Sequence, residues 1–228
     1  MIISIDGPAA SGKSTTAKLL SDRLNYIHLN TGLFYRAVTY IYIEKNLFDK
    51  KHYSIDKFFL NNDLNLYGDK LDKVIWNNLD ITKYLYNEKI NSKINVISNN
   101  HLIRKYLVDK QRNVSLNKNI VCEGRDIGTV VFPNAKFKFY LNASINSRIR
   151  RRYKEFNNNN IDVNEDQIKK NLIKRDANDI NRKISPLKKA DDAIEIDTTN
   201  MTIEQQVENI YNKIKQGIIE WQIKIKKK

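Results

Sequence analysis

One segment near the N-terminus limits the possible folds of this 228-residue chain more than any other: Gly7-Pro8-Ala9-Ala10-Ser11-Gly12-Lys13-Ser14. It matches the pattern G-x-x-x-x-G-K-[ST] in full, with an apolar, β-branched run at 2–6 before it and a helical pattern at 13–24 after it. Glycines allow the backbone to curl so that successive N–H groups point at phosphate oxygens, and the positive end of the helix dipole adds to the attraction. The segment predicts that a nucleoside triphosphate binds here.

Each group in this phosphate loop has a predicted role. Lys13 places a mobile positive charge against the β- and γ-phosphates, and the hydroxyl of Ser14 is a ligand for Mg²⁺. The residues expected to bind the triphosphate are Gly7, Pro8, Ala9, Ala10, Ser11, Gly12, Lys13, Ser14 and Thr15. The loop alone does not decide between a kinase, a GTPase and an ATPase.

The rest of the chain alternates strand-like and helical patterns. Strands are predicted at 2–6, 26–29, 119–123, 136–141 and 193–197, with helical patterns between them. Such an alternation predicts an α/β protein of the P-loop NTPase fold, with a five-stranded parallel sheet flanked by helices. Residues 63–82 instead alternate polar and apolar between turn signals, which predicts a small antiparallel β insert. We expect a single domain over 1–228, with its core at 1–53 and 93–228 and the insert at about 54–92.

Composition narrows the class of protein without choosing a function. The net charge of +14 suits a nucleic-acid binder, an enzyme rich in phosphate-binding arginines, or a chain with a coding bias towards Lys, Asn and Ile. No apolar run approaches the ~20 residues that span a bilayer, and the N-terminus does not resemble a signal peptide. The single cysteine, Cys122, excludes an intramolecular disulfide and fits a reducing compartment, so we expect a cytoplasmic protein.

Charged clusters downstream favour a small-molecule kinase. A GTPase would need an Asn-Lys-x-Asp motif, which the chain lacks. The apolar run 120–122 ends in Glu123-Gly124-Arg125-Asp126, a mixture of acids and arginine that suits a second, anionic substrate beside the metal. Transfer of a phosphoryl group needs positioned positive charge more than covalent chemistry from the protein. The arginines of the chain can supply that charge.

Two arginine-bearing helices are expected to frame the site. Arg148 and Arg152 fall at i and i+4 on one predicted helix, and a polar segment follows before the next helix. This arrangement is typical of a lid over ATP, which we place at about 148–166. On the next helical pattern Arg175, Asp179 and Arg182 are spaced to share one face, where arginines can clamp phosphate while the acid meets a donor on a base.

These motifs together resemble those of bacterial cytidylate kinases, in the nucleoside monophosphate kinase family, over about residues 2–215. The similarity is carried by four segments: Ile5-Asp6-Gly7-Pro8, Thr31-Gly32-Leu33-Phe34-Tyr35-Arg36, Gly124-Arg125-Asp126-Ile127-Gly128-Thr129-Val130-Val131-Phe132-Pro133, and Arg175-Asp176 with Asp179 and Asn181-Arg182. The resemblance implies ATP-dependent phosphorylation of CMP and dCMP with Mg²⁺. It also implies that the insert is the monophosphate-binding insert of the long bacterial form.

The resemblance further implies a role for each matching residue. Lys13, Arg152 and Arg175 would act on the transferring phosphoryl group, and Arg148 would cover ATP together with Arg152. Arg36 and Arg104 would contact the monophosphate, Thr31 and Arg125 would lie against the substrate, and Asp126 would face the sugar hydroxyls. Asp179 and Arg182 would read the cytosine edge or its phosphate. The full set implied to bind CMP is Thr31, Arg36, Asn95, Arg104, Arg125, Asp126, Asp179 and Arg182.

Two departures from the family pattern are visible. Asn95 stands where related enzymes have a substrate-facing serine, although its amide keeps both a donor and an acceptor. The phosphate loop has Ala9-Ala10-Ser11 and Lys13-Ser14 where many relatives have Ser-Gly-Ala and Lys-Gly, so Ser14 offers a metal ligand that those relatives lack.

Other functions remain open from the sequence. The acceptor could be UMP, another nucleoside monophosphate, or a small acceptor such as shikimate, and the net charge leaves room for a nucleic-acid-binding P-loop module. The chain carries no RNA-binding or helix-turn-helix signature. We therefore expect nucleotides (ATP, CMP and dCMP) as partners, no membrane or specific nucleic-acid partner, and a monomer.

Overall fold

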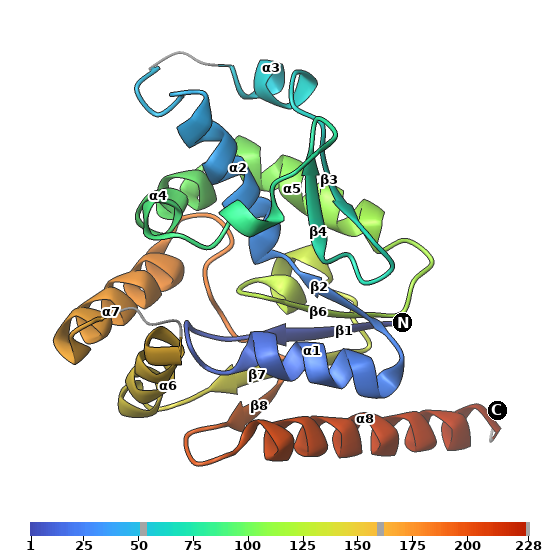
Figure 1. Cartoon of the computed structure of the whole chain (residues 1–228). Coiled ribbons are helices and arrows are strands. Elements are labelled where there is room, and N and C mark those ends of the chain that lie inside the picture. The colour runs from blue at the N-terminus through green and yellow to red at the C-terminus, as the bar shows by residue number, and fades with distance from the viewer. Residues whose placement is uncertain (51–53, 159–161, 227–228) are drawn as a thin grey trace.

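Five parallel strands form the central sheet of this computed structural model, which describes residues 1–50, 54–158 and 162–226 (Figure 1). The strand order is β2-β6-β1-β7-β8, with β1 at Ile2–Asp6, β2 at Ile27–Asn30, β6 at Ile120–Gly124, β7 at Phe137–Asn142 and β8 at Ile194–Asp197. Every neighbouring pair is parallel, so each connection crosses over a face of the sheet. The predicted five-stranded parallel sheet is confirmed.

Helices cover both faces of this sheet because its strands are apolar on both sides. The helices are α1 at Lys13–Leu24, α2 at Gly32–Glu44, α3 at Ile55–Leu60, α4 at Glu88–Asn99, α5 at His101–Val114, α6 at Ile145–Asn158, α7 at Glu165–Asn181 and α8 at Ile203–Lys226. On one face, Ile3 and Ile5 pack with Leu20 of α1 and Ile210 of α8. On the other face, Ile120 and Cys122 of β6 belong to a larger core with α2 and α5.

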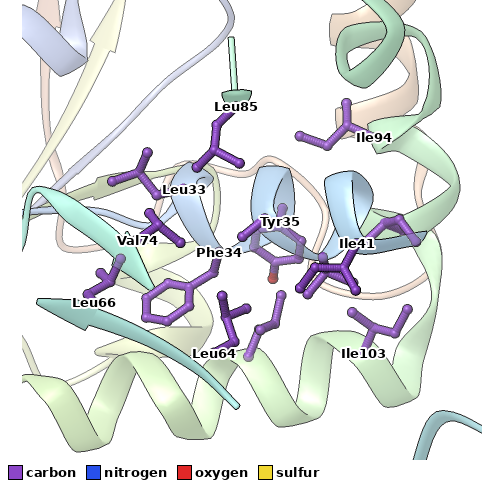
Figure 2. Packing of buried hydrophobic residues seen from close by; sticks show 14 of the residues in the cluster. Leu33, Phe34, Tyr35, Ile41, Leu64, Leu66, Val74, Leu85, Ile94 and Ile103 are labelled. Atoms are coloured by element: carbon purple, nitrogen blue, oxygen red, sulfur yellow. The ribbon is translucent and has the colours of Figure 1, made fainter. Parts of the chain in front are cut away.

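A second, antiparallel sheet of three strands interrupts the α/β pattern, as the sequence predicts. Its strands are β3 at Leu64–Tyr67, β4 at Lys73–Trp76 and β5 at Leu79–Asp80, and a 3-10 turn at Thr82–Tyr84 follows. Figure 2 shows Leu64, Leu66 and Val74 of this sheet around Phe34 of α2. Ile103 of α5 closes the same core from another side.

The helix α2 is therefore buried on most of its surface, which fixes the residues that it carries. Eight of its thirteen residues are buried, including Phe34, Tyr35 and Ile41. Leu85, just after the 3-10 turn, and Ile94 of α4 pack against the same helix (Figure 2). Since each fully buried large apolar side chain contributes about 1.5–3 kcal/mol, this packing ties the insert firmly to the core helix.

The helices α6 and α7 form a separate packing unit beside the phosphate loop. Ile149 of α6 packs with Ile168 and Leu172 of α7 and with Ala9 of the loop. Residues 159–161, within the lid expected at about 148–166, lie outside the described residues. In Figure 1, β1 starts beside the N-terminus and ends on the side where α6 and α7 lie.

The carboxyl ends of the parallel strands meet at one edge of the sheet, which is where ligands bind in open α/β sheets. The phosphate loop follows β1, Thr31 follows β2, and Arg125 follows β6 at this edge. The Cys122 thiol is buried within β6 as a free cysteine, and burial raises its pKa well above the ordinary value. Within the described ranges, no helix has the length and apolar character needed to cross a membrane.

Candidate active site

The phosphate loop has a backbone that only particular residues tolerate. A Cβ on Gly7 would lie 2.2 Å from the backbone oxygen of Leu141, so a larger residue cannot fit without moving β7. Gly12 has a φ of 94°, in the left-handed region that favours glycine. Ala10 also has a positive φ, of 58°, which costs an L-residue with a Cβ roughly 1–2 kcal/mol. The loop thus holds Ala10 in a backbone conformation that glycine adopts more easily.

The N–H groups of the loop are free to receive an anion. In the described part of the chain, those from Ala10 to Thr15 donate to no backbone or side-chain oxygen. The helix α1 has Gly12 at its N-cap with no capping side chain, and the buried hydroxyl of Ser11 has no hydrogen-bond partner among the described residues. Buried polar groups are almost always paired, so this row of unpaired donors is suited to phosphate oxygens.

The far side of the loop is held by residues from distant elements. Thr198 and Arg151 both donate to the backbone oxygen of Ser11, at 3.0 and 3.1 Å. Gln206 of α8 accepts from Thr16 at 2.8 Å, and its amide occupies the space where a Gly12 Cβ would be. These contacts fix the loop from behind and leave its N–H groups directed to the other side.

Positive charges converge on Lys13. Its side chain is buried, and its Nζ donates to the backbone oxygen of Pro8 at 3.1 Å. Burial lowers the pKa of Lys13 to about 7, and the nearby charges of Arg125 and Arg175 act in the same direction, against Glu123 and Asp179. A cation kept in such a place without a matching acid is suited to binding an anion.

Arg175 of α7 belongs to the same cluster of cations. Its guanidinium has no hydrogen bond or ion pair with any described residue. Burial, together with the charges of Arg125, Arg36 and Arg152 and against that of Asp179, lowers the pKa of Arg175 to about 10. Four arginines and Lys13 therefore act on one another within a single region next to the phosphate loop.

An alternating row of charges leads away from this region, and we call it the charge ladder: Arg125, Asp179, Arg182, Asp126 and Arg104. Arg125 Nε donates to Asp179 Oδ2 at 2.7 Å, and Asp179 Oδ1 lies 3.6 Å from Arg182 Nη1. Arg182 Nη2 lies 3.6 Å from Asp126 Oδ1, and Asp126 Oδ2 forms a short ion pair with Arg104. Although burial acts in the opposite direction, Arg125 and the other arginines hold the pKa of Asp179 below its ordinary value.

The ladder ends in a deeply buried group. The side chains of Arg104, Asp126 and Arg182 are 3%, 7% and 4% exposed, against 14% for Arg125. Arg104 Nη1 also donates to Ser98 O at 3.1 Å, and its guanidinium lies 5.2 Å from the centre of the Tyr35 ring. Arg104 Nε and Arg182 Nη2 are buried donors with no hydrogen-bond acceptor among the described residues.

The structure corrects one detail of the sequence interpretation. Arg182 was expected to share a helix face with Arg175 and Asp179, but α7 ends at Asn181 and Arg182 has an extended backbone. Its side chain still returns to Asp179, because Arg182 Nε donates to the backbone oxygen of Ser185 and so points back along the helix end. The pairing with Asp179 thus depends on the turn after the helix rather than on helical spacing.

Arg36, Thr31 and Asn95 lie along the wall between the phosphate loop and the buried end of the ladder. Arg36 Nη1 donates to Leu85 O and Asn91 Oδ1, both at 3.0 Å. Thr31 Oγ1 donates to the backbone oxygen of Glu123 at 2.9 Å. Asn95 of α4 lies one turn after Asn91, which binds Arg36, and one turn before Ser98, which binds Arg104. The helical spacing therefore places Asn95 on the same face, between the two arginines.

The two lid arginines differ in their contacts. Arg148 forms a short ion pair with Asp176 of α7 and donates to the backbone oxygen of Ala9 at 3.2 Å. Arg152 pairs with Glu155 on the same helix at 2.7 Å. Burial is the main cause that lowers the pKa of Arg36 and of Arg175, and the positive charge of Arg152 adds a smaller effect in the same direction. The structure thus brings Arg152 to the region of converging charge and holds Arg148 against the phosphate loop.

Comparison with known proteins identifies the family to which this arrangement belongs. A family model described as cytidylate kinase matches residues 3–216. The chain belongs to the cytidylate kinase family. The cytidylate kinase of Fusobacterium nucleatum subsp. nucleatum is 44% identical to it over 214 residues, which cover 94% of this chain and 97% of that protein. As a member of this family the chain is a nucleoside monophosphate kinase that uses ATP as its phosphoryl donor.

Solved structures match the chain over nearly its whole length, with low identity and low TM-scores. A Thermus thermophilus protein is 15% identical with a TM-score of 0.47, and the match covers 94% of this chain and 95% of that one. A shikimate kinase from Acinetobacter baumannii, solved in complex with shikimate, is 14% identical with a TM-score of 0.42, covering 96% of this chain and 93% of that one. Membership of the cytidylate kinase family rests on the sequence matches and favours a nucleotide acceptor over shikimate.

Two buried acids in this cytidylate kinase family member make contacts that the sequence did not assign, and a third is buried without such a contact. Asp6 accepts the N–H groups of Ile127 and Gly128 at 2.9 and 2.8 Å, which fixes the segment after Asp126. Burial raises the pKa of Asp6 to about 6. Glu123 is buried at the end of β6 and makes no hydrogen bond or ion pair through its carboxylate within the described residues. Asp176 accepts the N–H of Ala9 at 3.1 Å.

Proposed function

We propose that this chain transfers the γ-phosphoryl group of ATP to CMP and dCMP, producing CDP and dCDP for pyrimidine nucleotide metabolism. The observation that carries the proposal is the charge ladder. It starts with a surplus of positive charge beside the phosphate loop and ends in a buried group of ion-paired, hydrogen-bonding side chains. A nucleoside monophosphate has a matching order of groups, with an anionic phosphate at one end, a sugar in the middle and a hydrogen-bonding base at the other end.

The donor side of the site consists of the phosphate loop and the lid. The phosphate oxygens of ATP would accept hydrogen bonds from the free N–H groups of residues 10–15. Gly7, Pro8, Ala9 and Gly12 would give the loop its shape. Arg148 and Arg152 of α6 would lie along the ATP phosphates and adenine, with Arg152 nearer the γ-phosphate because its charge reaches Arg175. Lys13, Arg175 and Arg152 would stabilise the charge on the transferring group.

A magnesium ion fits the residues at this site. Within the described residues, no group of three His, Cys, Asp or Glu side chains could hold a metal by itself. Mg²⁺ in phosphoryl transfer usually keeps several waters and binds one or two protein groups plus substrate phosphates. The hydroxyl of Ser14, exposed at the start of α1, and the unpaired carboxylate of Glu123 are such groups. When bound beside Ser14 and Glu123, Mg²⁺ would neutralise part of the charge on the ATP phosphates.

On the acceptor side we propose a revised division of roles. Sequence interpretation gave Arg104 to the phosphate and Asp126 to the sugar hydroxyls. Arg104 is already neutralised by Asp126 and is 3% exposed, which suits a neutral base better than a dianion. The CMP phosphate would bind Arg36 and Arg125, near Lys13 and Arg175. The sugar would lie near Asp179, which is the next group along the ladder.

Cytosine would bind the buried end of the ladder. Its exocyclic amine is a donor, which Asp126 can accept, and its ring nitrogen and carbonyl are acceptors for the unpaired nitrogens of Arg104 and Arg182. Asn95 and Thr31 would line the walls of the same pocket. Uracil presents an oxygen where cytosine presents the amine, and that oxygen would face the carboxylate of Asp126.

The movements follow from the same division. We propose that residues 54–92 act as the monophosphate-binding insert and residues 148–166 as the lid of one kinase domain, and that both close over the bound nucleotides. Closure would exclude water and align the CMP phosphate in line with the γ-phosphate of ATP. We also propose a monomeric, cytoplasmic enzyme with no nucleic-acid partner, in which the cations around Lys13 and Arg175 bind nucleotides.

The substitution Asp126→Asn tests the choice of base. The amide has a donor where the carboxylate accepts from the cytosine amine, so the ratio of kcat/KM for CMP to that for UMP should fall about tenfold or more. The measurement is a coupled assay with CMP, UMP, AMP and GMP and Mg-ATP. Asp109→Asn, an exposed acid on α5, is the matched control and should keep the wild-type ratio. An unchanged ratio in Asp126→Asn, or wild-type preference for UMP or AMP, would contradict the cytosine assignment.

The pKa of Lys13 predicts proton uptake when ATP binds. With a pKa of about 7, only about 3% of free molecules carry that proton at pH 8.5, and the phosphates should restore the charged form. Calorimetric titration at pH 8.5 in two buffers of different ionisation enthalpy should therefore show uptake of close to one proton. The same depressed pKa means that the unfolded chain binds more protons between pH 7 and 10.5, so the stability of the free protein should gain from Lys13 as pH rises through that range. Binding without proton uptake at pH 8.5 would show that Lys13 is already charged.

A further inference from the structure

The peptide groups of Ala9 are held by two side chains, one from α6 and one from α7. The carboxylate of Asp176, on α7, accepts the Ala9 N–H through Oδ1 at 3.1 Å. The guanidinium of Arg148, on α6, donates to the Ala9 backbone oxygen at 3.2 Å. Asp176 Oδ2 and Arg148 Nη1 also form a short ion pair with each other. One carboxylate and one guanidinium thus enclose the donor and the acceptor of a single loop residue.

This arrangement is buried and connected to both helices. The side chains of Asp176 and Arg148 are each 11% exposed, and Arg148 Nε additionally donates to Ala143 O at 3.2 Å. Ala9 itself packs against Ile149, Ile168 and Leu172, so apolar contact and hydrogen bonding act at the same point. A buried acid in such a position stabilises only the geometry in which all of its partners are present.

The location of Asp176 on α7 links this contact to the chemistry. Arg175 is its neighbour in sequence, and Asp179 lies about one helical turn further along α7. Arg175 makes no hydrogen bond or ion pair with the described residues, so nothing in its own side chain fixes where α7 lies relative to the phosphate loop. The Ala9 N–H donates to Asp176, so it is not one of the free N–H groups of residues 10–15 that are expected to bind phosphate.

We propose that Asp176 is a positioning residue for phosphoryl transfer. By binding Ala9 and Arg148 together, it fixes α7 against the phosphate loop and so places Arg175 over the phosphates of ATP. Asp176 itself touches neither nucleotide. This inference rests on the proposed kinase activity and adds to it the residue that couples the lid to the loop.

The test compares Asp176→Asn and Asp176→Ala with Arg148→Met and with the double variant Asp176→Ala/Arg148→Met. Because a displacement of about 1 Å can reduce a rate about 100-fold, kcat should fall about tenfold or more in each single variant. The affinity for CMP alone should change less than about threefold, since the groups at the buried end of the ladder lie outside α6 and the middle of α7. The double variant should be no slower than the slower single variant, because the two side chains act as one unit.

Three further readouts separate positioning from general stability. The amide exchange of Ala9, followed by NMR, should accelerate in Asp176→Ala and less in Asp176→Asn, whose side-chain oxygen can still accept the N–H. Thermal melts identify any variant that is unfolded at the assay temperature, and Asp176→Asn, which preserves the shape of the side chain, then replaces Asp176→Ala. Asp109→Asn, at an exposed acid on α5 outside the lid and the insert, makes the same chemical change and should leave kcat unchanged.

The outcomes are distinct. A folded Asp176→Asn or Asp176→Ala enzyme with kcat within twofold of wild type overturns the inference, and so do losses that multiply in the double variant. A parallel loss of CMP affinity and kcat in every variant also overturns it, because that pattern indicates general disruption. If the wild-type enzyme does not phosphorylate CMP, the proposed function fails instead, and the Ala9 exchange measurement still reports on the contact.

Discussion

Replacing Lys13 by alanine should lower kcat for CMP phosphorylation about 10³-fold or more, which corresponds to about 4 kcal/mol of transition-state stabilisation. Lys13 is buried at the start of α1, and its amine donates to Pro8 O at 3.1 Å. With ATP in the loop, this amine would lie beside phosphate oxygens whose negative charge grows during transfer. Because the position is buried, water cannot take the place of the amine in the alanine variant.

The measurement is steady-state kinetics with saturating Mg-ATP and CMP, together with direct titration of ATP binding. Lys18→Ala removes an exposed lysine from the same helix and should keep wild-type kcat. Burial and the charges of Arg125 and Arg175 disfavour the charged form of the Lys13 amine in the protein without ATP. Lys13→Ala should therefore not lower the melting temperature at pH 7. A loss of less than tenfold in kcat would show that the lysine is not central to transfer.

Replacing Arg175 by methionine should also lower kcat about 10³-fold, since an arginine on the transferring group contributes about 10³–10⁵ in rate in related chemistry. Its guanidinium is half-buried among the charges of Arg125, Arg36 and Arg152 and has no ion-pair partner among the described residues. Folding gains nothing from a cation in such surroundings, which indicates that the group is retained for an anionic ligand.

The control for this substitution is next to it in the sequence. Lys174→Met changes an exposed cation on α7 and should leave both kcat and KM unchanged. Arg175→Met should melt no lower than the wild type at pH 7, because burial disfavours the charge of Arg175 and its removal also relieves repulsion with Arg125. A lower melting temperature with little change in kcat would make Arg175 a structural residue and would contradict its assigned role.

Local patterns were sufficient to predict the framework of the fold. The alternation of apolar runs and helical patterns predicted the five strands of the parallel sheet, and the polar–apolar alternation after residue 62 predicted the antiparallel insert. These features depend on residues that are close in sequence, because strand and helix periodicities act over a few residues. The placement of Arg182 by helical spacing was wrong, since Arg182 follows the end of α7 and its side chain is held by a contact with Ser185.

The sequence by itself determined the phosphate loop, the order of strands and helices, and the residue types available to hold two nucleotides. Only the tertiary structure decided which of those charges neutralise one another. Asp126 pairs with Arg104 from α5 and Asp179 pairs with Arg125 from the end of β6, while Arg175 and Lys13 have no acid partner in the described part of the chain. Asp176 reaches Ala9 across 167 positions of sequence. The physical reason is that electrostatic energy and burial depend on distances between atoms in space, and no spacing along the chain records the distances that the folded sheet and its crossover helices create.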